Sequence, residues 1–598
     1  MEEEAHKLEL EVLSSPLVAS REAQFGFQIN ESVVYLILFS STAVLHCAIF
    51  NFSSELRQFL QVDMYPFGIV LLLSWTFAGL IHFFGGLAGD LVRDRVLLLR
   101  RTAVLWGIAV LAFHVAAFQM SSLVSLVSMV SGLLCAGVAH GIVCPNVIAL
   151  GVESKFSAES EASYLSDVSS TMSDEQQQHY DSGSHNFFTV CFAARLAGST
   201  LVQGYYFVLV DVETFSADNE QTTVDSRGFH CLLLMSFGLM ASLIYFCFQS
   251  WNYSHSDDFT SSNETIWTWS WTNLVRLCNR VLVGYALLAF VLMTLIGAGF
   301  SLVAVLLATR FSLPVRLVAF LLTVTGWLLT MVASSRQLNP TKKHLVRVSR
   351  RLGLRSRQLY LAIFAVAFIC VSGCVAFLRA QLYSSMLAQV CQTRLLIPGT
   401  ISTYFNPELL GTAVGTSSLV FIGLFRLLPS LASCPPVTRM CFAMLLYLVS
   451  VFLSSVVELY RRQALVSPFV LSRSCGAVHS EFTFIWTSPY MILLGASDAL
   501  FRVSFQEACH DLVRGSFGSS SRRWTGTVQG AISLAEALGY TTALSLVAVL
   551  SRWLFQREPT DMALFFLLLT TVIALTHAML NRIAARAQDY QRLYFSVR

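Results

Sequence analysis

The sequence predicts an all-α polytopic membrane protein. Of its 598 residues, 55% are hydrophobic and only 13% are charged, whereas a soluble protein carries about 25% charged residues. The hydrophobic residues form repeated long runs, and about 20 mainly apolar residues are enough for one helix to cross a bilayer. Strands of a membrane β-barrel would instead alternate between apolar and polar positions. The net charge of +3 gives no indication of a nucleic-acid partner.

Fourteen apolar segments are long enough to be membrane helices. They lie at 30–50, 66–89, 101–120, 123–151, 187–210, 228–249, 281–308, 313–335, 359–388, 404–428, 438–459, 485–506, 524–550 and 561–583. We expect an N-terminal tail (1–29), a bundle of six helices (30–249), a linker with two extra helices (250–358), a second bundle of six (359–583) and a C-terminal tail (584–598).

The charges outside these segments predict the orientation of the chain. The N-terminal MEEEAHKLELEV is acidic and polar, unlike a cleavable signal peptide. Short cytoplasmic loops are enriched in Lys and Arg, and the basic segments 93–101, 336–357 and 514–523 fall on one side if the N-terminus is cytoplasmic. Both termini are therefore predicted to be cytoplasmic. Arg461, Arg462 and Arg473 run against this pattern, because they fall in a predicted outer loop.

A polar, serine-rich stretch interrupts the first bundle at residues 152–186. Its composition, with few apolar residues, predicts a disordered cytoplasmic loop. Two interpretations remain open: a flexible connector, or a segment that is phosphorylated or binds a partner.

The stretch GGLAGDLVRDR (85–95) joins the second and third predicted spans. Glycines allow two helices to approach closely, and an acid and an arginine at a turn can pair with each other and with helix ends. If these bonds form in only one of two states, the segment acts as a latch, and its candidate gating residues are Gly85, Gly86, Asp90 and Arg95. The alternative is an ordinary basic loop.

This stretch and five later motifs resemble, in order, the proton-coupled oligopeptide transporter family of the major facilitator superfamily. GGLAGDLVRDR is similar to the family's GGxxADxxxGR, HGIVCPNVIALGVESKF (140–156) to GGIKPNVxxFGxDQF, and FFTVCFAARLAGS (187–199) to FFxxFYxxxNxGS. IPGTISTYFNP (397–407), PPVTRMCFAMLLYLVSVFLSSVVELYRR (435–462) and SPYMILLGASDALF (488–501) resemble the family's eighth, ninth and tenth helices. The resemblance implies a major facilitator fold, with two six-helix bundles and an extra helix pair at 281–335, and transport by alternating access.

Four positions that the family links to proton coupling differ in this sequence. The ExxER cluster aligns with Gln28, Glu31 and Ser32, and the lysine of the fourth helix aligns with Cys144. The acid of the seventh helix aligns with Ala380, and a histidine of the second helix aligns with Leu72. Glu31 and His140 remain as coupling candidates. His140 lies four residues before Cys144 and could titrate in place of the lysine, or it could be a packed core histidine.

The resemblance implies a substrate site. Tyr35 matches a position that faces the central cavity, and Asn406 and Asp498 match the pair that receives the substrate's amino group. A carboxylate and an amide oxygen suit an ammonium group, which donates three hydrogen bonds.

The partner of the substrate carboxylate is left open by the family motifs. Arg195 and Arg379 are the candidates for it, because arginine binds a carboxylate through two parallel hydrogen bonds. Gln381, next to Ala380, is a further substrate-binding candidate. The alternative for each arginine is an internal ion pair. Arg502 lies four residues after Asp498 and could neutralise it, which would close the amino-group pocket.

The predicted function is secondary active transport of small peptides, amino acids or peptide-like solutes, with proton coupling uncertain. The alternative is a transporter-like scaffold or sensor that has lost coupled transport. An enzyme is not expected, because HExxH, GxSxG and similar motifs are missing. The 14 cysteines form no CxxC pair, so neither a metal site nor a cofactor is expected. We expect a monomer in the plasma membrane or an endolysosomal membrane, with the solute, the bilayer and a proton as its partners.

Overall fold

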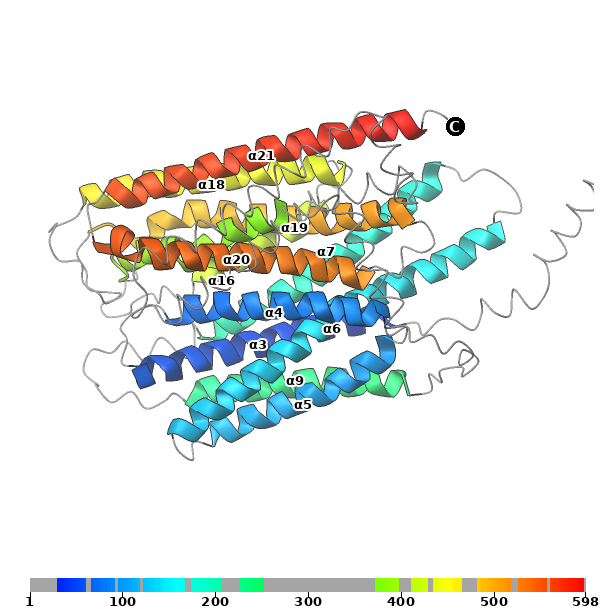
Figure 1. Ribbon diagram of the computed structural model, residues 1–598, viewed down its shortest axis with the longest axis horizontal. Helices are drawn as coiled ribbons and strands as arrows, with labels where there is room; N and C mark the ends of the chain where they lie inside the picture. Colours follow the sequence, from blue (N-terminus) through cyan, green and yellow to red (C-terminus); the bar gives the residue numbers. More distant parts are fainter. Residues whose placement is uncertain are drawn as a thin grey trace, which may run out of the picture.

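The long elements of the structure, a computed structural model, are helices (Figure 1). It describes residues 29–60, 66–91, 95–118, 122–166, 174–206, 226–251, 371–396, 410–427, 434–464, 481–517, 525–556 and 560–595. These residues contain no strand, and their one isolated β-bridge joins Arg394 to Thr483. The prediction of an all-α protein is confirmed.

Twelve of the fourteen predicted spans correspond to described helices. The first half contains α3 (Glu31–Leu60), α4 (Pro66–Leu91), α5 (Arg95–Ala117), α6 (Ser122–Ser166), α7 (Asp174–Tyr205) and α9 (Ser226–Gln249). In the second half, a helix over 371–380 continues through η4 (Gln381–Tyr383) into α15 (Ser385–Cys391). It is followed by α16 (Leu410–Leu427), α18 (Pro436–Gln463), η6 (Phe484–Thr487), α19 (Ser488–Phe517), α20 (Thr525–Gln556) and α21 (Thr560–Phe595). The predicted pair at 281–335 lies outside the described residues.

Several helices are longer than the apolar runs that predict them. Helix α6 continues to Ser166 and α7 begins at Asp174, so both extend into the segment 152–186 that the sequence predicts to be disordered. The end of α6, ESKFSAESEASYLS, contains neither proline nor glycine, and its Glu and Ala residues favour a helix. Hydropathy locates the part of a helix that can lie in a bilayer, but a polar helix can continue beyond it.

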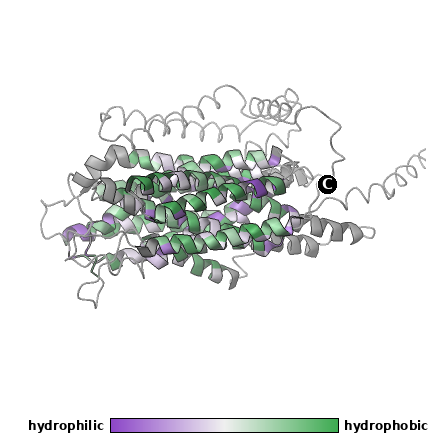
Figure 2. Ribbon diagram, turned by 90° about the horizontal axis from the view of Figure 1, so that it is seen from below, coloured by the Kyte–Doolittle hydropathy of each residue, from purple (hydrophilic) through white to green (hydrophobic). Residues whose placement is uncertain are grey.

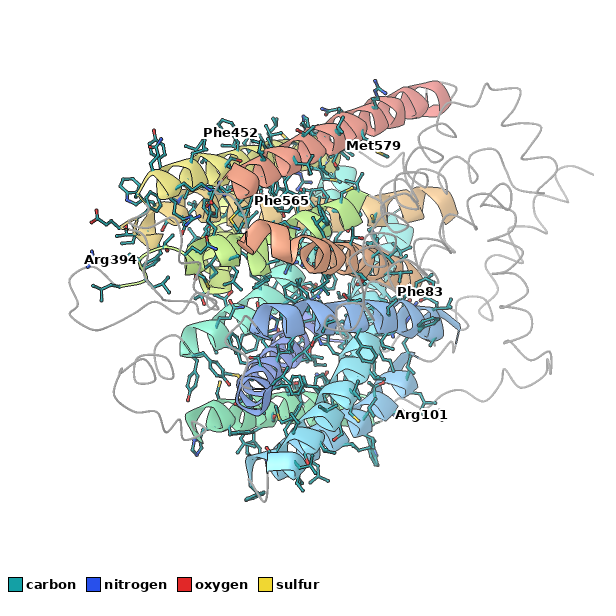
Figure 3. All side chains as sticks on the ribbon, turned by 60° about the vertical axis from the view of Figure 1, so that its left-hand side comes forward. Phe83, Arg101, Arg394, Phe452, Phe565 and Met579 are labelled. Atoms are coloured by element: carbon teal, nitrogen blue, oxygen red, sulfur yellow. The ribbon has the colours of Figure 1, made fainter. Side chains whose placement is uncertain are left out.

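The surface of the bundle is apolar. Seven of the described helices are long and apolar enough to cross a membrane, judged by length and composition. Large apolar side chains are exposed, among them Phe452, Leu575 and Phe248. Hydrophobic residues predominate along the helices (Figure 2), and Phe452 lies on the outside of the bundle (Figure 3). Exposed Arg101 and Arg394 lie near opposite ends of the bundle (Figure 3). An apolar belt between charged ends is the surface that a bilayer requires.

The two halves meet along α4 and α20, and along α7 and α16 (Figure 1). Glycines bring the backbones of α4 and α20 into contact. A Cβ atom added to Gly79 would lie 2.6 Å from the carbonyl oxygen of Ser533, and one added to Gly530 would lie 2.7 Å from that of His82. In a membrane, where lipid is as apolar as leucine, such close packing is what holds helices together.

A buried ion-pair cluster lies at the far end of α18. The carboxylate of Glu458 lies 2.7 Å from both Arg461 and Arg462 and accepts a hydrogen bond from Gln389. These two arginines are among the three that run against the predicted orientation, and the third, Arg473, lies outside the described residues. Their charge is partly neutralised within the protein, so they carry less weight in a count of basic loop residues.

Candidate functional site

A cavity lies between the two halves, with about 970 Å³ of space not filled by atoms, open solvent included. Both halves supply polar side chains to its walls. They are His46 from α3, Trp75 and His82 from α4, His140 from α6 and Arg195 from α7, and, across the cavity, Arg379, Asp498, Arg502, Glu536 and Tyr540.

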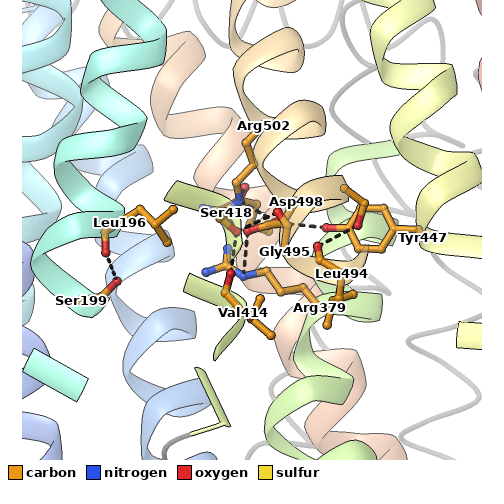
Figure 4. Close-up of polar contacts among 12 residues, drawn as sticks. Leu196, Ser199, Arg379, Val414, Ser418, Tyr447, Leu494, Gly495, Asp498 and Arg502 are labelled. Carbon is orange, nitrogen blue, oxygen red and sulfur yellow. Dashed lines mark hydrogen bonds and ion pairs between the residues drawn. The ribbon is translucent and has the colours of Figure 1, made fainter. Parts of the chain in front are cut away.

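Asp498 is the centre of a buried ion-pair network in the second half (Figure 4). One carboxylate oxygen lies 3.2 Å from Nε of Arg502, and the other lies 3.7 Å from Nε of Arg379. The hydroxyl of Tyr447 donates a hydrogen bond of 3.0 Å to the same carboxylate. The acid is therefore neutralised by two guanidinium groups, so the amino-group pocket that the sequence predicts is occupied in this conformation.

Helix α16 holds α19 in place beside this network. The hydroxyl of Ser418 lies 2.7 Å from the carbonyl oxygen of Gly495, three residues before Asp498 (Figure 4). Gly495 permits this contact, because a Cβ atom there would lie 2.5 Å from the carbonyl oxygen of Val414.

The two arginines share further partners. Glu536 lies 3.4 Å from Nη2 of Arg502, and the hydroxyl of Tyr540 accepts hydrogen bonds from Arg379 at 3.2 Å and Arg502 at 3.3 Å. Arg379 also lies 4.7 Å from the ring centroid of Trp75, a cation–π contact. Since Trp75 belongs to α4, this contact links the network to the first half of the molecule.

Arg195 differs from the other two arginines. It lines the cavity and makes no hydrogen bond or ion pair with the residues that the structure describes. The wall contains the three arginines 195, 379 and 502 but only the two carboxylates of Asp498 and Glu536. With histidines counted as neutral, the cavity therefore has one positive charge in excess.

The sequence-predicted site residues are only partly brought together. Arg195, Arg379, Asp498 and His140 surround the cavity, whereas Asn406 lies outside the described residues. Glu31 and Tyr35, which the resemblance implies to be near the cavity, lie in the first turns of α3, where the hydroxyl of Tyr35 donates a 2.7 Å hydrogen bond to Glu31.

Gln381 is not among the cavity residues either. It is buried at the break between the helix 371–380 and α15, where its side-chain oxygen accepts a hydrogen bond from Ser385 at 2.9 Å. The side chain satisfies polar groups that this break in the helix leaves exposed.

Several wall residues are not among those that the sequence predicts. His46 and His82 are polar residues inside apolar runs, so the criterion that selected His140 could have selected them too. Trp75 and Tyr540 carry no such signal, because aromatic residues are common in membrane helices. Only the packing of α4 against α20 shows that both reach the arginines.

The predicted latch segment joins the halves at one end of the bundle, which we call the Asp90 end. Asp90 accepts hydrogen bonds from the amide of Gly526 at 3.2 Å and from the amide and hydroxyl of Thr527, both at 2.6 Å. These amides belong to the first turn of α20, where a carboxylate is favoured by the helix dipole. Arg95 forms ion pairs with Asp90 and Glu153.

Two glycines of this segment lie close to the backbone of neighbouring helices. A Cβ atom on Gly85 would lie 2.7 Å from the carbonyl oxygen of Gly141 in α6, and one on Gly86 would overlap the carbonyl group of Gly526 in α20. The segment therefore contacts both its own half and the opposite half.

No family model matches the sequence, and no curated protein matches it. Solved structures do match. The POT family transporter PepTSo has a TM-score of 0.57 at 12% identity, over 93% of this chain and 98% of that chain. A POT family transporter in complex with a thioalcohol-conjugated peptide has a TM-score of 0.54 at 12% identity, over 93% and 96%. An auto-inhibited POT family peptide transporter has a TM-score of 0.53 at 13% identity, over 93% and 96%. The chain thus has the major facilitator fold of the POT family peptide transporters.

Proposed function

We propose that this protein is a divergent member of the proton-coupled oligopeptide transporter family and carries peptide-like or amino-acid solutes by alternating access. The fold supports this, and so does the cavity between the halves, because a site at this interface can open to each side of the membrane in turn. One of the similar structures contains a peptide conjugate. The sequence motifs for the fourth, fifth and tenth helices support the same family.

The excess positive charge of the cavity is the observation that carries the proposal. Arg195 makes no hydrogen bond or ion pair with the described residues, while Asp498 already has two ion pairs. The solute is therefore held first through its carboxylate, by Arg195, and not through its amino group. Arginine suits this role, because its planar guanidinium matches the two oxygens of a carboxylate.

Proton coupling, if present, does not follow the family's usual arrangement. Glu31 lies at the start of α3, bound to Tyr35, and is not among the cavity residues. His140 lines the cavity beside His82. Of the two coupling candidates, Glu31 and His140, only His140 lines the cavity.

The test is uptake of a labelled dipeptide by proteoliposomes that contain the full-length protein, with and without a pH gradient. Arg195→Gln should weaken peptide binding by about 10- to 100-fold, the effect of losing a charge-assisted hydrogen bond. Because Arg195 has no ion pair among the described residues to lose, the melting temperature should stay close to that of the wild type. Arg195→Lys should retain part of the binding, since it keeps the charge.

Arg394→Gln is the control variant, because Arg394 is exposed at the end of the bundle, away from the cavity. Peptide binding by Arg195→Gln at wild-type strength would refute the assignment of the carboxylate site. Complete absence of peptide binding and uptake in the wild-type protein would instead favour a scaffold or sensor.

A further inference from the structure

Three potential metal ligands lie together in the first half of the molecule, beside the cavity. One nitrogen of His82, one nitrogen of His140 and the sulfur of Cys144 all lie within 4.8 Å of one another. All three residues are buried, with exposed fractions of 6%, 3% and 1%. His82 belongs to α4, and the other two belong to α6.

The fold brings these residues together through the spacing of α6 and one close contact between α6 and α4. His140 and Cys144 are four residues apart, so they lie on the same face of α6 one turn from each other. Gly141, next to His140, lies against Ile81, the neighbour of His82, and a Cβ atom on Gly141 would lie 2.7 Å from Cβ of Ile81. The two imidazole rings are consequently 5.3 Å apart in an edge-to-face arrangement.

The second observation concerns the ring nitrogens of His82. Both are buried and make no hydrogen bond of normal geometry with the described residues, apart from a weaker contact with the carbonyl of Ala78, one turn earlier. Buried polar groups are almost always satisfied in native proteins. A buried histidine that lacks a good hydrogen bond and lies beside another histidine and a thiol indicates a ligand that all three can bind.

We propose that His82, His140 and Cys144 bind a transition metal ion of the Zn²⁺ class. In a tetrahedral zinc site, bond lengths of about 2.0–2.3 Å place the ligand atoms about 3.3–3.6 Å apart. Nε2 of His140 lies 3.4 Å from Sγ of Cys144, so these two already have the required separation. Two imidazoles and a thiolate bind zinc in preference to magnesium or calcium.

The position of the cluster predicts an open coordination site. His82 and His140 line the cavity, whereas Cys144 is not among the wall residues. Three protein ligands leave the fourth position of zinc to water or to another small ligand, the arrangement found where a metal exchanges ligands. Here that position faces the cavity.

The charges around the cluster are compatible with a cation. On binding, the Cys144 thiol loses its proton to solvent, so the site gains a thiolate charge that offsets part of the metal's charge. Arg195 on α7 faces the same cavity and opposes a cation, while Asp498 and Glu536 on the opposite wall favour one. Because of the thiol proton, metal affinity should increase as the pH rises.

The test uses the purified full-length protein, free of metal and of any histidine tag, titrated with Co²⁺ and Zn²⁺. We expect one Co²⁺ per chain with the near-ultraviolet charge-transfer absorption of a cobalt–thiolate bond, and Zn²⁺ should displace it. Cys144→Ser should abolish that absorption, and His82→Gln should weaken Zn²⁺ binding by at least about 10-fold.

Matched controls are Cys135→Ser, on the same helix but outside the cluster, and His114→Gln, whose Nδ1 bonds to its own helix. Both should bind Zn²⁺ as the wild type does.

Zn²⁺ should also raise the melting temperature of the wild type but not of Cys144→Ser, a nearly isosteric change that leaves folding intact. The proposal would be overturned if Cys144→Ser and His82→Gln both bound Zn²⁺ with wild-type affinity. It would also be overturned if the wild-type protein lacked the cobalt–thiolate absorption. Since no peptide is used, this outcome would be independent of the proposed transport function.

Discussion

At the scale of single residues, Asp498 shows how one carboxylate can have two incompatible roles. The sequence leaves both open, because Arg502 lies one turn away on the same helix while the family motif assigns the acid to a substrate amine. The structure adds Arg379 from a different helix, at 3.7 Å, and the hydroxyl of Tyr447 at 3.0 Å. The sequence alone could not reveal these partners, because it does not say which helices are neighbours.

Asp498→Asn should therefore destabilise the protein. Removing one partner of a buried ion pair leaves an uncompensated charge and costs about 3–5 kcal/mol, and here two arginines are affected. The variant should unfold at a clearly lower temperature, measured by the intrinsic fluorescence of the protein in detergent. Glu536→Gln is the comparison, because the one ion pair of Glu536 within the described residues is with Arg502, at 3.4 Å, and its side chain is 23% exposed. It should cause a smaller loss. If Asp498→Asn instead keeps wild-type stability but no longer binds a peptide with a free amino group, Asp498 is the ammonium site after all.

At the scale of helices, the apolar runs predict where each element lies better than where it ends. The runs are visible because about 20 consecutive apolar residues are rare outside membranes. The ends of α6, α7 and α21 are polar and helical, and no hydropathy signal separates a polar helix from a loop. The glycines of GGLAGDLVRDR did predict a close helix approach. That Gly86 meets Gly526, on the other half, became apparent only from the fold.

Gly86→Ala should weaken the contact between α4 and α20. The added methyl group would overlap the backbone carbonyl of Gly526, which cannot move without shifting the start of α20. We expect a lower melting temperature, by an amount equivalent to about 1–3 kcal/mol, the usual cost of overpacking. Gly238→Ala in α9 is the control, because nothing lies within 4 Å of its Cβ position. Alanine is a better helix former than glycine, so this control should be neutral or slightly stabilising. Equal effects of the two variants would show that the α4–α20 contact does not require glycine.

At the scale of the whole molecule, the two halves are joined by contacts of two kinds. Near the cavity, Trp75 of the first half lies against Arg379 and 5.2 Å from the ring of Tyr540. At the Asp90 end, the carboxylate of Asp90 is hydrogen-bonded to the first turn of α20. The family resemblance carried by the motifs implied the two-bundle fold, and the stretch GGLAGDLVRDR predicted the latch segment. The partner of Asp90 could not be predicted, because Thr527 lies 437 residues further along the chain.

The contact between Asp90 and Thr527 should control whether the Asp90 end opens. Thr527→Val removes one hydroxyl bond of 2.6 Å to a carboxylate and leaves the two amide bonds in place. A hydrogen bond to a charged group contributes about 1.5–3 kcal/mol, so the population open at this end should rise by about 10- to 100-fold. Hydrogen–deuterium exchange should detect this as faster exchange of amides in the peptides that contain Asp90 and Thr527. Thr542→Val is the matched control, because within the described part of the chain the hydroxyl of Thr542 bonds only to the carbonyl of Leu538 in its own helix. If exchange at the Asp90 end is the same in both variants, the contact is a passive part of the packing and not a latch. If it accelerates only in Thr527→Val, the same variant should also change the rate of peptide uptake, because the proposed alternating access requires this end to open and close.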